Sequence, residues 1–383
     1  MPDHRSTPDA CPGALHVHEA ADGALSRIRL PGGHLAPSRL QALAEAAEHL
    51  GNGEIELTSR GNVQLRSVRD PQELAQRLAT AGLLPSATHE RVRNVLGSPL
   101  SGRLGGRHDI RDLVHDLDRR LIADPALAEL PGRVLFTVDD GRGDVSPFGG
   151  DFGIHAIGDD RFALVLAGSD TGVRLDAADT VIALLDSARA FLDLRERHWR
   201  LAELDDGARR TLEHLGVEPE IPPAGRVTGD ADARPPVGWF AQHDGRVALG
   251  ATVALGVLPA RTARFLAAVE RPVIVTPWRS ILLVDLDEWV GEQVVRVLAP
   301  MGLIFDADSP WAQVSACAGS PGCAKSLADV RSDVRAAVEE DMLPVEGRQH
   351  WSGCERRCGS PGHGERTDVV ATGHGYRVDT PSR

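Results

Sequence analysis

Four cysteines near the end of the sequence have the residue type and spacing of a metal-binding set. Cys317 and Cys323 have five residues between them, thirty residues follow, and Cys354 and Cys358 have three between them. Four thiolates are the usual ligands of a [4Fe–4S] cluster, which carries electrons. Glycines and prolines around both pairs let the backbone wrap closely and aim N–H groups at sulfur. The pattern predicts a redox protein with these four cysteines as its metal ligands.

Two other interpretations of the cysteines are weaker. Structural zinc sites usually have about two to four residues between paired ligands, whereas the first pair here has five. Disulfide frameworks are typical of small secreted domains, whereas this chain has 383 residues and five cysteines in all. The fifth, Cys11, stands alone and has the ordinary interpretation of a structural thiol.

The composition is typical of a globular protein that stays in water. Hydrophobic residues make up 42% and charged residues 25% of the chain. The sequence contains no run of about eighteen apolar residues, which is the length needed to span a membrane. The first residues show no apolar signal core, so we expect a cytoplasmic protein. The net charge of −13 argues against nucleic-acid binding, which depends on neutralising phosphates.

The basic residues are almost all arginine, and Lys325 is the only lysine. A bound carboxylate would therefore meet a guanidinium, whose planar fork suits it. Candidates for contacting an anionic ligand stand at predicted strand ends or in loops: Arg29, Arg60, Arg66 and Arg93 in the first half, and Arg279 in the second. For any single arginine, a solvated surface charge is the commoner outcome.

The elements that would position these residues repeat along the chain. Apolar spacing predicts strand, helix, strand and helix over 25–35, 37–50, 55–65 and 71–83, and again over 245–255, 261–269, 272–286 and 289–301. A threonine closes the apolar run of the second strand in each copy, at Thr58 and Thr276. We interpret the copies as an internal duplication; the alternative is a chance likeness of two β-α-β-α units.

A larger segment follows each copy. The first, at about 95–215, is predicted to contain strands near 134–138 and 163–167 and a helix from 178 to about 199, and the second, at about 303–383, carries the four cysteines. The stretch between the halves is rich in Pro, Gly and Asp and predicts a linker. No G-x-G-x-x-G follows a predicted strand and no Walker sequence is present, so electrons should come from a separate donor.

Taken in order, these features resemble the sirohaem-dependent nitrite and sulfite reductases. The likeness is carried by the cysteine spacing, the duplicated units, and the motifs Arg29-Leu-Pro-Gly-Gly33, Leu57-Thr-Ser-Arg60 and Arg93-Asn-Val95. One branch of that superfamily, the precorrin-3B synthases, is more similar still. It is matched by Cys11-Pro-Gly13, Asp139-Asp-Gly-Arg-Gly-Asp144 and Thr276-Pro-Trp-Arg279.

The resemblance implies an α+β fold of duplicated nitrite/sulfite reductase-like architecture. It has two ferredoxin-like half-domains, two larger α/β domains that hold the cluster and the tetrapyrrole, and pseudo-two-fold symmetry. The half-domains would occupy 1–90 and 237–302, the larger domains 91–215 and 303–383, and the linker 216–236. The last of these domains contains the four cysteines.

The same resemblance implies a monooxygenase of cobalamin biosynthesis. It would hydroxylate the tetrapyrrole precorrin-3A at C20 and close a γ-lactone, using O2 and NADH-derived electrons. The implied cofactors are a [4Fe–4S] cluster and a mononuclear non-haem iron. The implied partners are a tetrapyrrole with many carboxylates and an external electron donor, either a ferredoxin or an NADH-dependent reductase. The iron ligands stay open among His363, His374, Asp139, Asp140 and His155.

Two alternative functions remain. The first is a sirohaem-dependent sulfite or nitrite reductase, in which the counterpart of Cys358 bridges the cluster to the haem. The reductases carry two lysines that help bind and protonate the anion, and the matching positions here hold Leu135 and Thr137. The second is a non-catalytic iron–sulfur protein that transfers electrons. Such a protein would not need two duplicated halves that bear arginines.

Overall fold

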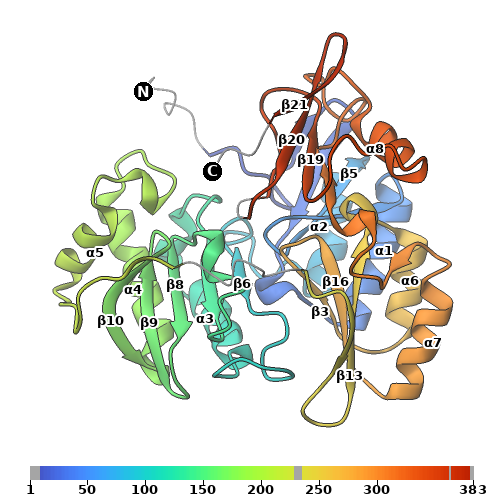
Figure 1. The fold of residues 1–383 in the computed structure, drawn as a ribbon. Helices are drawn as coiled ribbons and strands as arrows, with labels where there is room; N and C mark the ends of the chain where they lie inside the picture. The colour runs from blue at the N-terminus through green and yellow to red at the C-terminus, as the bar shows by residue number, and fades with distance from the viewer. Residues whose placement is uncertain (1–8, 228–234, 362–363, 380–383) are drawn as a thin grey trace. The chain divides into compact units, whose positions relative to one another are not determined.

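A computed structural model describes residues 9–227, 235–361 and 364–379. The chain divides into two compact units, and Figure 1 shows its course. Unit 1 consists of Met1–Gly13, Ile28–His34 and Leu83–Arg234, and unit 2 of Ala14–Arg27, Leu35–Gly82 and Pro235–Arg383. The segment predicted as the first half-domain, 1–90, therefore contributes residues to both units. No helix among the described residues is long and apolar enough to cross a membrane.

Unit 1 is built on one six-stranded sheet in the order β11-β10-β9-β8-β7-β6. The strands are β6 (Val95–Gly97), β7 (Phe136–Asp139), β8 (Phe152–Ala156), β9 (Arg161–Leu166), β10 (Ser169–Asp176) and β11 (Gly225–Arg226). Helices α3 (Arg111–Ala123), α4 (Ala177–Leu194) and α5 (Gly207–Leu215) belong to the same unit. Apolar side chains of α3 and α4, such as Leu117 and Phe191, share a core with Phe136 and Phe152 of the sheet. The predicted helix to residue 199 ends earlier, at Leu194.

Unit 2 contains both copies of the duplicated unit, apart from the segment Ile28–His34 of the first copy. The first copy runs through β2 (Gly23–Ile28), β3 (His34–Leu35), α1 (Pro37–Leu50), β4 (Glu54–Leu57), β5 (Val63–Val68) and α2 (Pro71–Thr80). The second runs through β13 (Val247–Val253), β14 (Val257–Pro259), α6 (Ala260–Ala268), β15 (Val273–Val275), β16 (Ser280–Leu286) and α7 (Glu288–Leu298). The two copies have the same order of elements, which supports the predicted duplication.

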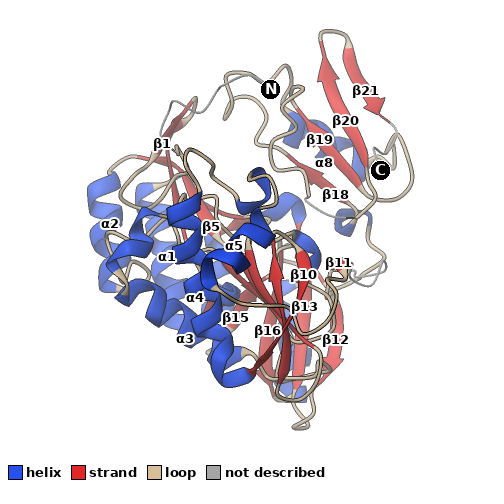
Figure 2. Ribbon diagram, turned by 90° about the vertical axis from the view of Figure 1, so that its left-hand side faces the viewer, coloured by secondary structure: helices blue, strands red, loops and turns tan. Residues whose placement is uncertain are grey.

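The two copies exchange a strand. The first sheet has the order β1-β2-β5-β4-β14, in which β1 is His18–Ala20, and the second has the order β12-β13-β16-β15-β3, in which β12 is Gly238–Ala241. Strand β17 (Leu303–Ile304) pairs with β13. The strand that precedes α6 thus completes the sheet of the first copy, with Leu258 opposite Ile55, and the strand that precedes α1 completes the sheet of the second. Helices α1 and α2 pack together and α1 lies on β4 and β5 (Figure 2).

Each predicted second strand is a hairpin, so the expectations of single strands over 55–65 and 272–286 were wrong. In the first copy the Thr58 N–H donates to the Asn62 carbonyl at 2.9 Å, and in the second the Thr276 N–H donates to the Ser280 carbonyl at 2.9 Å. Each five-residue turn is closed by a threonine hydroxyl that accepts from the backbone N–H four residues later. Alternating apolar residues on both sides of the turn concealed it in the sequence.

A third sheet of unit 2 carries the cysteines. Its order is β18-β19-β20-β21, with β18 at Val314–Ala316, β19 at Gln349–Ser352, β20 at Thr367–Thr372 and β21 at Gly375–Asp379. Helix α8 (Val330–Glu339) packs on β18 and β19 (Figure 1). Val330 and Val334 of α8 are fully buried against Val314 and Trp351 of the sheet.

Candidate metal and anion site

The third sheet brings the two cysteine pairs to one edge. Strands β18 and β19 are parallel neighbours, with Ala316 opposite Trp351. Cys317 follows β18 directly, and Cys354 comes two residues after the end of β19. Because neighbouring parallel strands end at the same edge, residues that follow them lie close together. The fold therefore places the first cysteine of one pair beside the first of the other, although they are 37 positions apart in sequence.

The backbone around the cysteines approaches their sulfur atoms closely. The Gly353 N–H donates to the Cys317 Sγ at 3.2 Å, which is the kind of contact that tunes thiolate ligands. A side chain at Gly353 would place its Cβ 1.7 Å from the Ser326 Oγ, so glycine is required by this close approach. Burial, and after it the charges of Cys354 and Cys317, raise the pKa of Cys358. The thiols therefore lie near enough to repel one another as thiolates.

The spacing of the four thiols does not suit a compact zinc site. Zinc–sulfur bonds of about 2.3 Å in a tetrahedron hold sulfurs about 3.8 Å apart. Among the described residues, no three cysteine sulfurs lie within 4.8 Å of one another. A [4Fe–4S] cluster places its four metal atoms between the thiolates and so needs a wider set. All four cysteines are free thiols that at least partly reach the surface, and the residues present fit a cluster.

A pocket of about 280 Å³ opens beside two of the cysteines, within unit 2. Cys317 and Cys358 line it together with Gly359. Five arginines and one carboxylate are among its described lining residues: Arg27, Arg60, Arg66, Arg279, Arg331 and Glu56. The volume lies near the small end of ligand pockets, which range from about 300 to 1,000 Å³. The pocket thus suits an acidic arm or edge of a ligand.

The polar face of the first sheet forms one wall of this pocket. Side chains alternate along β5, so Val63 and Leu65 face away from Gln64. Gln64 lies opposite Glu56 of β4 in the strand register. Glu56 is 4% exposed, so the charged face of this sheet is buried as well as the apolar one. Burial of a charged residue in a strand is unusual unless the residue is paired or functional.

A hydrogen-bonded chain crosses this wall. The Arg27 Nη2 donates to the Gln64 Oε1 at 2.9 Å, and the Gln64 Nε2 donates to the Glu56 Oε2 at 2.5 Å. Arg331 of α8 completes the chain with its Nη1 2.5 Å from the Glu56 Oε1. The chain therefore connects the first sheet to the helix of the cysteine-bearing segment. The sequence analysis did not identify Arg27, Glu56 and Arg331 as site residues. Charged and polar residues alternate with apolar ones in 54–57 and 63–68, and this alternation could have indicated a polar face on the sheet.

Arg66 also connects the first sheet to the cysteine-bearing segment. Its Nε and Nη2 donate to the two carboxylate oxygens of Asp22 at 2.8 and 2.7 Å, and Nη2 also donates to the Gly322 carbonyl at 2.7 Å. Gly322 directly precedes Cys323. Burial of Asp22 opposes ionisation, but the hydrogen bond and charge of Arg66 lower the pKa of Asp22 below its usual range. Both partners are thus charged near neutral pH.

Arg279 lies on the second copy's hairpin turn, where it adopts a left-handed backbone with φ of 59°. In the first copy, the residue at the same place in the turn is Gly61, with φ of 62°. The predicted counterparts Arg60 and Arg279 are therefore offset by one position, and Trp278 takes the place that corresponds to Arg60. The Arg279 Nη2 donates to the Gly359 carbonyl. Burial lowers the pKa of Arg279 to about 10, so it remains charged at neutral pH.

His350 of β19 contacts the same loop, at Cys358. Its ring is fully buried, with Nε2 3.2 Å from the Cys358 carbonyl and Nδ1 2.9 Å from the Ser315 Oγ. A carbonyl only accepts, so the ring proton of the neutral imidazole belongs on Nε2. The Ser315 hydroxyl lies within hydrogen-bond distance of both Nδ1 and the Gln349 carbonyl. Burial, and after it the charge of Arg279, lower the pKa of His350 to about 3. Sequence reasoning also missed this residue.

Two of the predicted anion-binding arginines belong to unit 1. Arg93 is buried and forms a bidentate pair with Asp118, with both distances at 2.7 Å. Arg29 is 3% exposed. The pocket brings together Arg60, Arg66 and Arg279 of the predicted set and adds Arg27 and Arg331. A role for any of the five predicted arginines in substrate binding stays a prediction.

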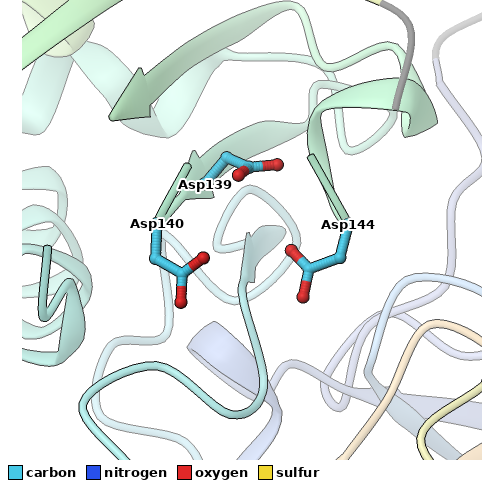
Figure 3. A group of neighbouring side chains, drawn as sticks. All are labelled: Asp139, Asp140 and Asp144. Carbon is cyan, nitrogen blue, oxygen red and sulfur yellow. The ribbon is translucent and has the colours of Figure 1, made fainter. Parts of the chain in front are cut away.

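Three acidic residues of unit 1 form a second cluster (Figure 3). One oxygen of each of Asp139, Asp140 and Asp144 lies within 4.8 Å of the others. Asp139 accepts backbone N–H groups of four residues in its own loop, at 2.9 to 3.1 Å. Burial alone would raise the pKa of Asp139, but the hydrogen bond and charge of His155 and these N–H donors lower it well below its usual range. Asp139 therefore organises the loop as a carboxylate.

The pKa of Asp144, in the same cluster, is shifted in the opposite direction. Burial, and after it the charge of Asp139, raise the pKa of Asp144 to about 8. Its Oδ1 accepts from the Ser98 Oγ at 2.5 Å. Arg142 holds the third carboxylate, Asp140, at 2.6 Å. The cluster therefore favours a proton on Asp144 beside the ionised Asp139, and an arginine, a serine and backbone amides hold the three side chains.

The described residues show no trio of two histidines and a carboxylate as close as the three aspartates. The His155 Nδ1 lies 3.4 Å from the Asp139 Oδ1 and also contacts Ser146. His374 lies in the β20–β21 turn of unit 2, and His363 lies outside the described residues. The ligands of a mononuclear iron thus stay open.

Comparisons with known proteins agree with the fold. A family described as the nitrite/sulfite reductase ferredoxin-like half domain matches residues 16–79. A precorrin-3B synthase of a Sinorhizobium species is 27% identical over 97% of this chain and 82% of that protein. A ferredoxin sulfite reductase of Mycobacterium tuberculosis is 25% identical over 93% of this chain and 72% of that protein.

A solved structure has the same architecture. The Mycobacterium tuberculosis NirA protein superimposes with a TM-score of 0.74 at 20% identity, over 93% of this chain and 74% of that one. The predicted α+β, nitrite/sulfite reductase-like fold with duplicated half-domains is confirmed. The chain thus carries the ferredoxin-like half domain of the nitrite and sulfite reductases and is similar over nearly its whole length to a precorrin-3B synthase.

Proposed function

We propose that this protein is an oxidoreductase that holds a [4Fe–4S] cluster on Cys317, Cys323, Cys354 and Cys358 and acts on an acidic tetrapyrrole. The observation that carries the proposal is the shared pocket: Cys317 and Cys358 line the same space as five arginines. An electron-carrying group beside a set of guanidiniums suits electron-transfer chemistry at a bound substrate that bears carboxylates. The likeness to a precorrin-3B synthase over nearly the whole chain supports an acidic tetrapyrrole as the substrate class.

The proposed reaction is the hydroxylation of precorrin-3A at C20, with closure of a γ-lactone from an acetate side chain. One oxygen atom of O2 enters the substrate and the other leaves as water, and the two electrons come from NADH through an external ferredoxin or reductase. The cluster would supply single-electron transfer, and a mononuclear non-haem iron would supply O2 activation. Arg60, Arg66 and Arg279 would bind and orient the carboxylates in the pocket, and Arg29 and Arg93 are further candidates.

The residues that replace the reductase lysines support a monooxygenase over a sulfite or nitrite reductase. Leu135 packs with Leu96 and Val145 in an apolar cluster. Thr137 is 1% exposed, and its hydroxyl lies against Gly153, where an added Cβ would come within 2.3 Å. Neither position offers a cation to an anion being reduced. A sirohaem-dependent reductase remains the second candidate, because a reductase is 25% identical over 93% of the chain.

The test is anaerobic reconstitution of the cluster followed by addition of precorrin-3A, O2 and a reductant. The expected product is heavier than the substrate by one oxygen atom, and 18O2 should label it. Omitting O2 is the control. Reduction of sulfite or nitrite without a change in precorrin-3A, together with the intense visible spectrum of sirohaem, would favour the reductase. A cluster without either activity would indicate an electron carrier.

A further inference from the structure

Backbone carbonyls at and after Cys358, the exposed cysteine of the four, accept hydrogen bonds from residues on other elements. Among the described cysteines Cys358 is exposed to solvent, while the other four are partly buried. It lies in a loop between β19 and β20, outside regular structure. A ligand on an exposed loop is held poorly unless something fixes the peptide units beside it.

Two successive carbonyls at this point are held from different elements. The Cys358 carbonyl accepts from the His350 Nε2 at 3.2 Å, and the Gly359 carbonyl accepts from the Arg279 Nη2. His350 belongs to β19 and is itself held by Ser315 of β18 at 2.9 Å. Arg279 belongs to the hairpin turn of the second copy. The two donors therefore connect one loop to both the cysteine-bearing sheet and the pocket wall.

The backbone of Arg279 adopts a conformation that favours glycine. A left-handed conformation costs a residue other than glycine about 1–2 kcal/mol, and glycine avoids that cost. The first copy uses Gly61 at the same turn position, whereas the second uses Arg279, with φ of 59°. An arginine kept in a strained conformation where glycine would be relaxed needs a compensating contact. The contact that its guanidinium makes here is the Gly359 carbonyl.

We propose that Arg279 and His350 are positioning residues for Cys358, which fix the orientation of its thiolate toward the cluster by holding the carbonyls of Cys358 and Gly359. The inference rests on the proposed cluster and adds a second role for Arg279 beside substrate binding. His350 acts through the backbone of Cys358 and touches no substrate. Loss of either donor frees one peptide plane and lets the exposed loop move away from the metal.

The test is the rate at which a chelator removes iron from the reconstituted, full-length protein under anaerobic conditions. Loss of one hydrogen bond worth about 1.4 kcal/mol corresponds to about tenfold, so His350→Ala and Arg279→Met should each lose iron about ten times faster than the wild type. His350→Gln keeps an amide donor near the Nε2 position and should recover most of the difference. Matched controls are His243→Ala and Arg271→Met, which change the same residue types outside the pocket and should keep the wild-type rate.

The electron paramagnetic resonance spectrum of the reduced cluster separates positioning from general stability. We expect altered g values for His350→Ala and Arg279→Met, and wild-type g values for His350→Gln. Should His350→Ala not fold, Ser315→Ala and Arg279→Met decide the question, since both leave the histidine in place. Wild-type chelation rates and spectra in these variants would overturn the inference. A wild-type protein that takes up no cluster would instead overturn the proposed function.

Discussion

Replacing Asp144 with asparagine should stabilise the protein at neutral pH and have little effect in acid. Burial and the charge of Asp139 raise the pKa of Asp144 to about 8. The folded protein therefore keeps a proton on Asp144 that the unfolded chain releases above about pH 4. Because the unfolded state binds fewer protons in this window, stability falls as pH rises from about 4 to about 8. Asparagine cannot ionise and removes this contribution.

The size of the effect follows from one proton. A single group contributes at most about 1.4 kcal/mol per pH unit to the slope of the unfolding free energy. Between pH 5.5 and 7.5, the difference in stability between Asp144→Asn and the wild type should thus grow by about 2–3 kcal/mol in favour of the variant. Urea unfolding at several pH values, followed by circular dichroism and by tryptophan fluorescence, measures this difference. Titrations elsewhere in the protein are common to both chains and cancel.

The matched control is Asp205→Asn, which makes the same chemical change on an exposed residue of unit 1. Its difference from the wild type should not vary with pH. A constant difference for Asp144→Asn across the same range would show that Asp144 is ionised in the folded protein. That result would refute the raised pKa of Asp144.

Other predictions concern the arginines of the pocket. Arg66→Met should lower the unfolding free energy by about 3 kcal/mol, because it leaves Asp22 without its partner. The double variant Arg66→Met with Asp22→Asn should lose less stability than the two single variants lose together. Losses that add up strictly in urea unfolding would contradict a stabilising Arg66–Asp22 ion pair. Arg60→Ala should raise the dissociation constant of the tetrapyrrole about tenfold in a spectroscopic titration, and an unchanged constant would remove Arg60 from the site. Arg279→Gly should unfold with a free energy about 1 kcal/mol higher than Arg279→Ala, and equal thermal stabilities would contradict the backbone strain. The purified protein with NADH alone should turn over poorly, and rapid oxidation of NADH coupled to product would show that no separate donor is needed.

Local patterns predicted the helices of the duplicated copies well. The predicted helix over 37–50 is observed at Pro37–Leu50, and the one over 261–269 at Ala260–Ala268. Both have apolar residues at helical spacing that are buried in the fold, so local periodicity and tertiary burial agree. The hairpins at 58–62 and 276–280 were missed because strand alternation continues on both sides of a five-residue turn. Turn formation there depends on a threonine side chain and on left-handed residues, which apolar periodicity does not detect.

The pocket could be predicted in part. The four cysteines were selected by spacing alone, and Arg60 and Arg279 by their place after an apolar run. Glu56 and Arg331 were not found, because they come together across 275 positions of sequence and contact each other through tertiary packing. His350 lies in a strand whose four residues are all buried, so the sequence pattern there indicates a core strand and gives no sign of a polar role.

The duplication explains how the proposed cluster site would be held from two sides. Arg66, from the first copy, donates to the carbonyl that precedes Cys323, and Arg279, from the second copy, donates to the carbonyl that follows Cys358. Each copy therefore supplies one cation to one cysteine pair, although the two arginines stand at different places in their modules. Because these donors come from 23–82 and 247–298, the segment 303–383 would lack both if it were isolated. The cysteine-bearing sheet and the arginine-bearing sheets would thus form one site, because Arg66 and Arg279, which hold the cysteine loops, also line the pocket.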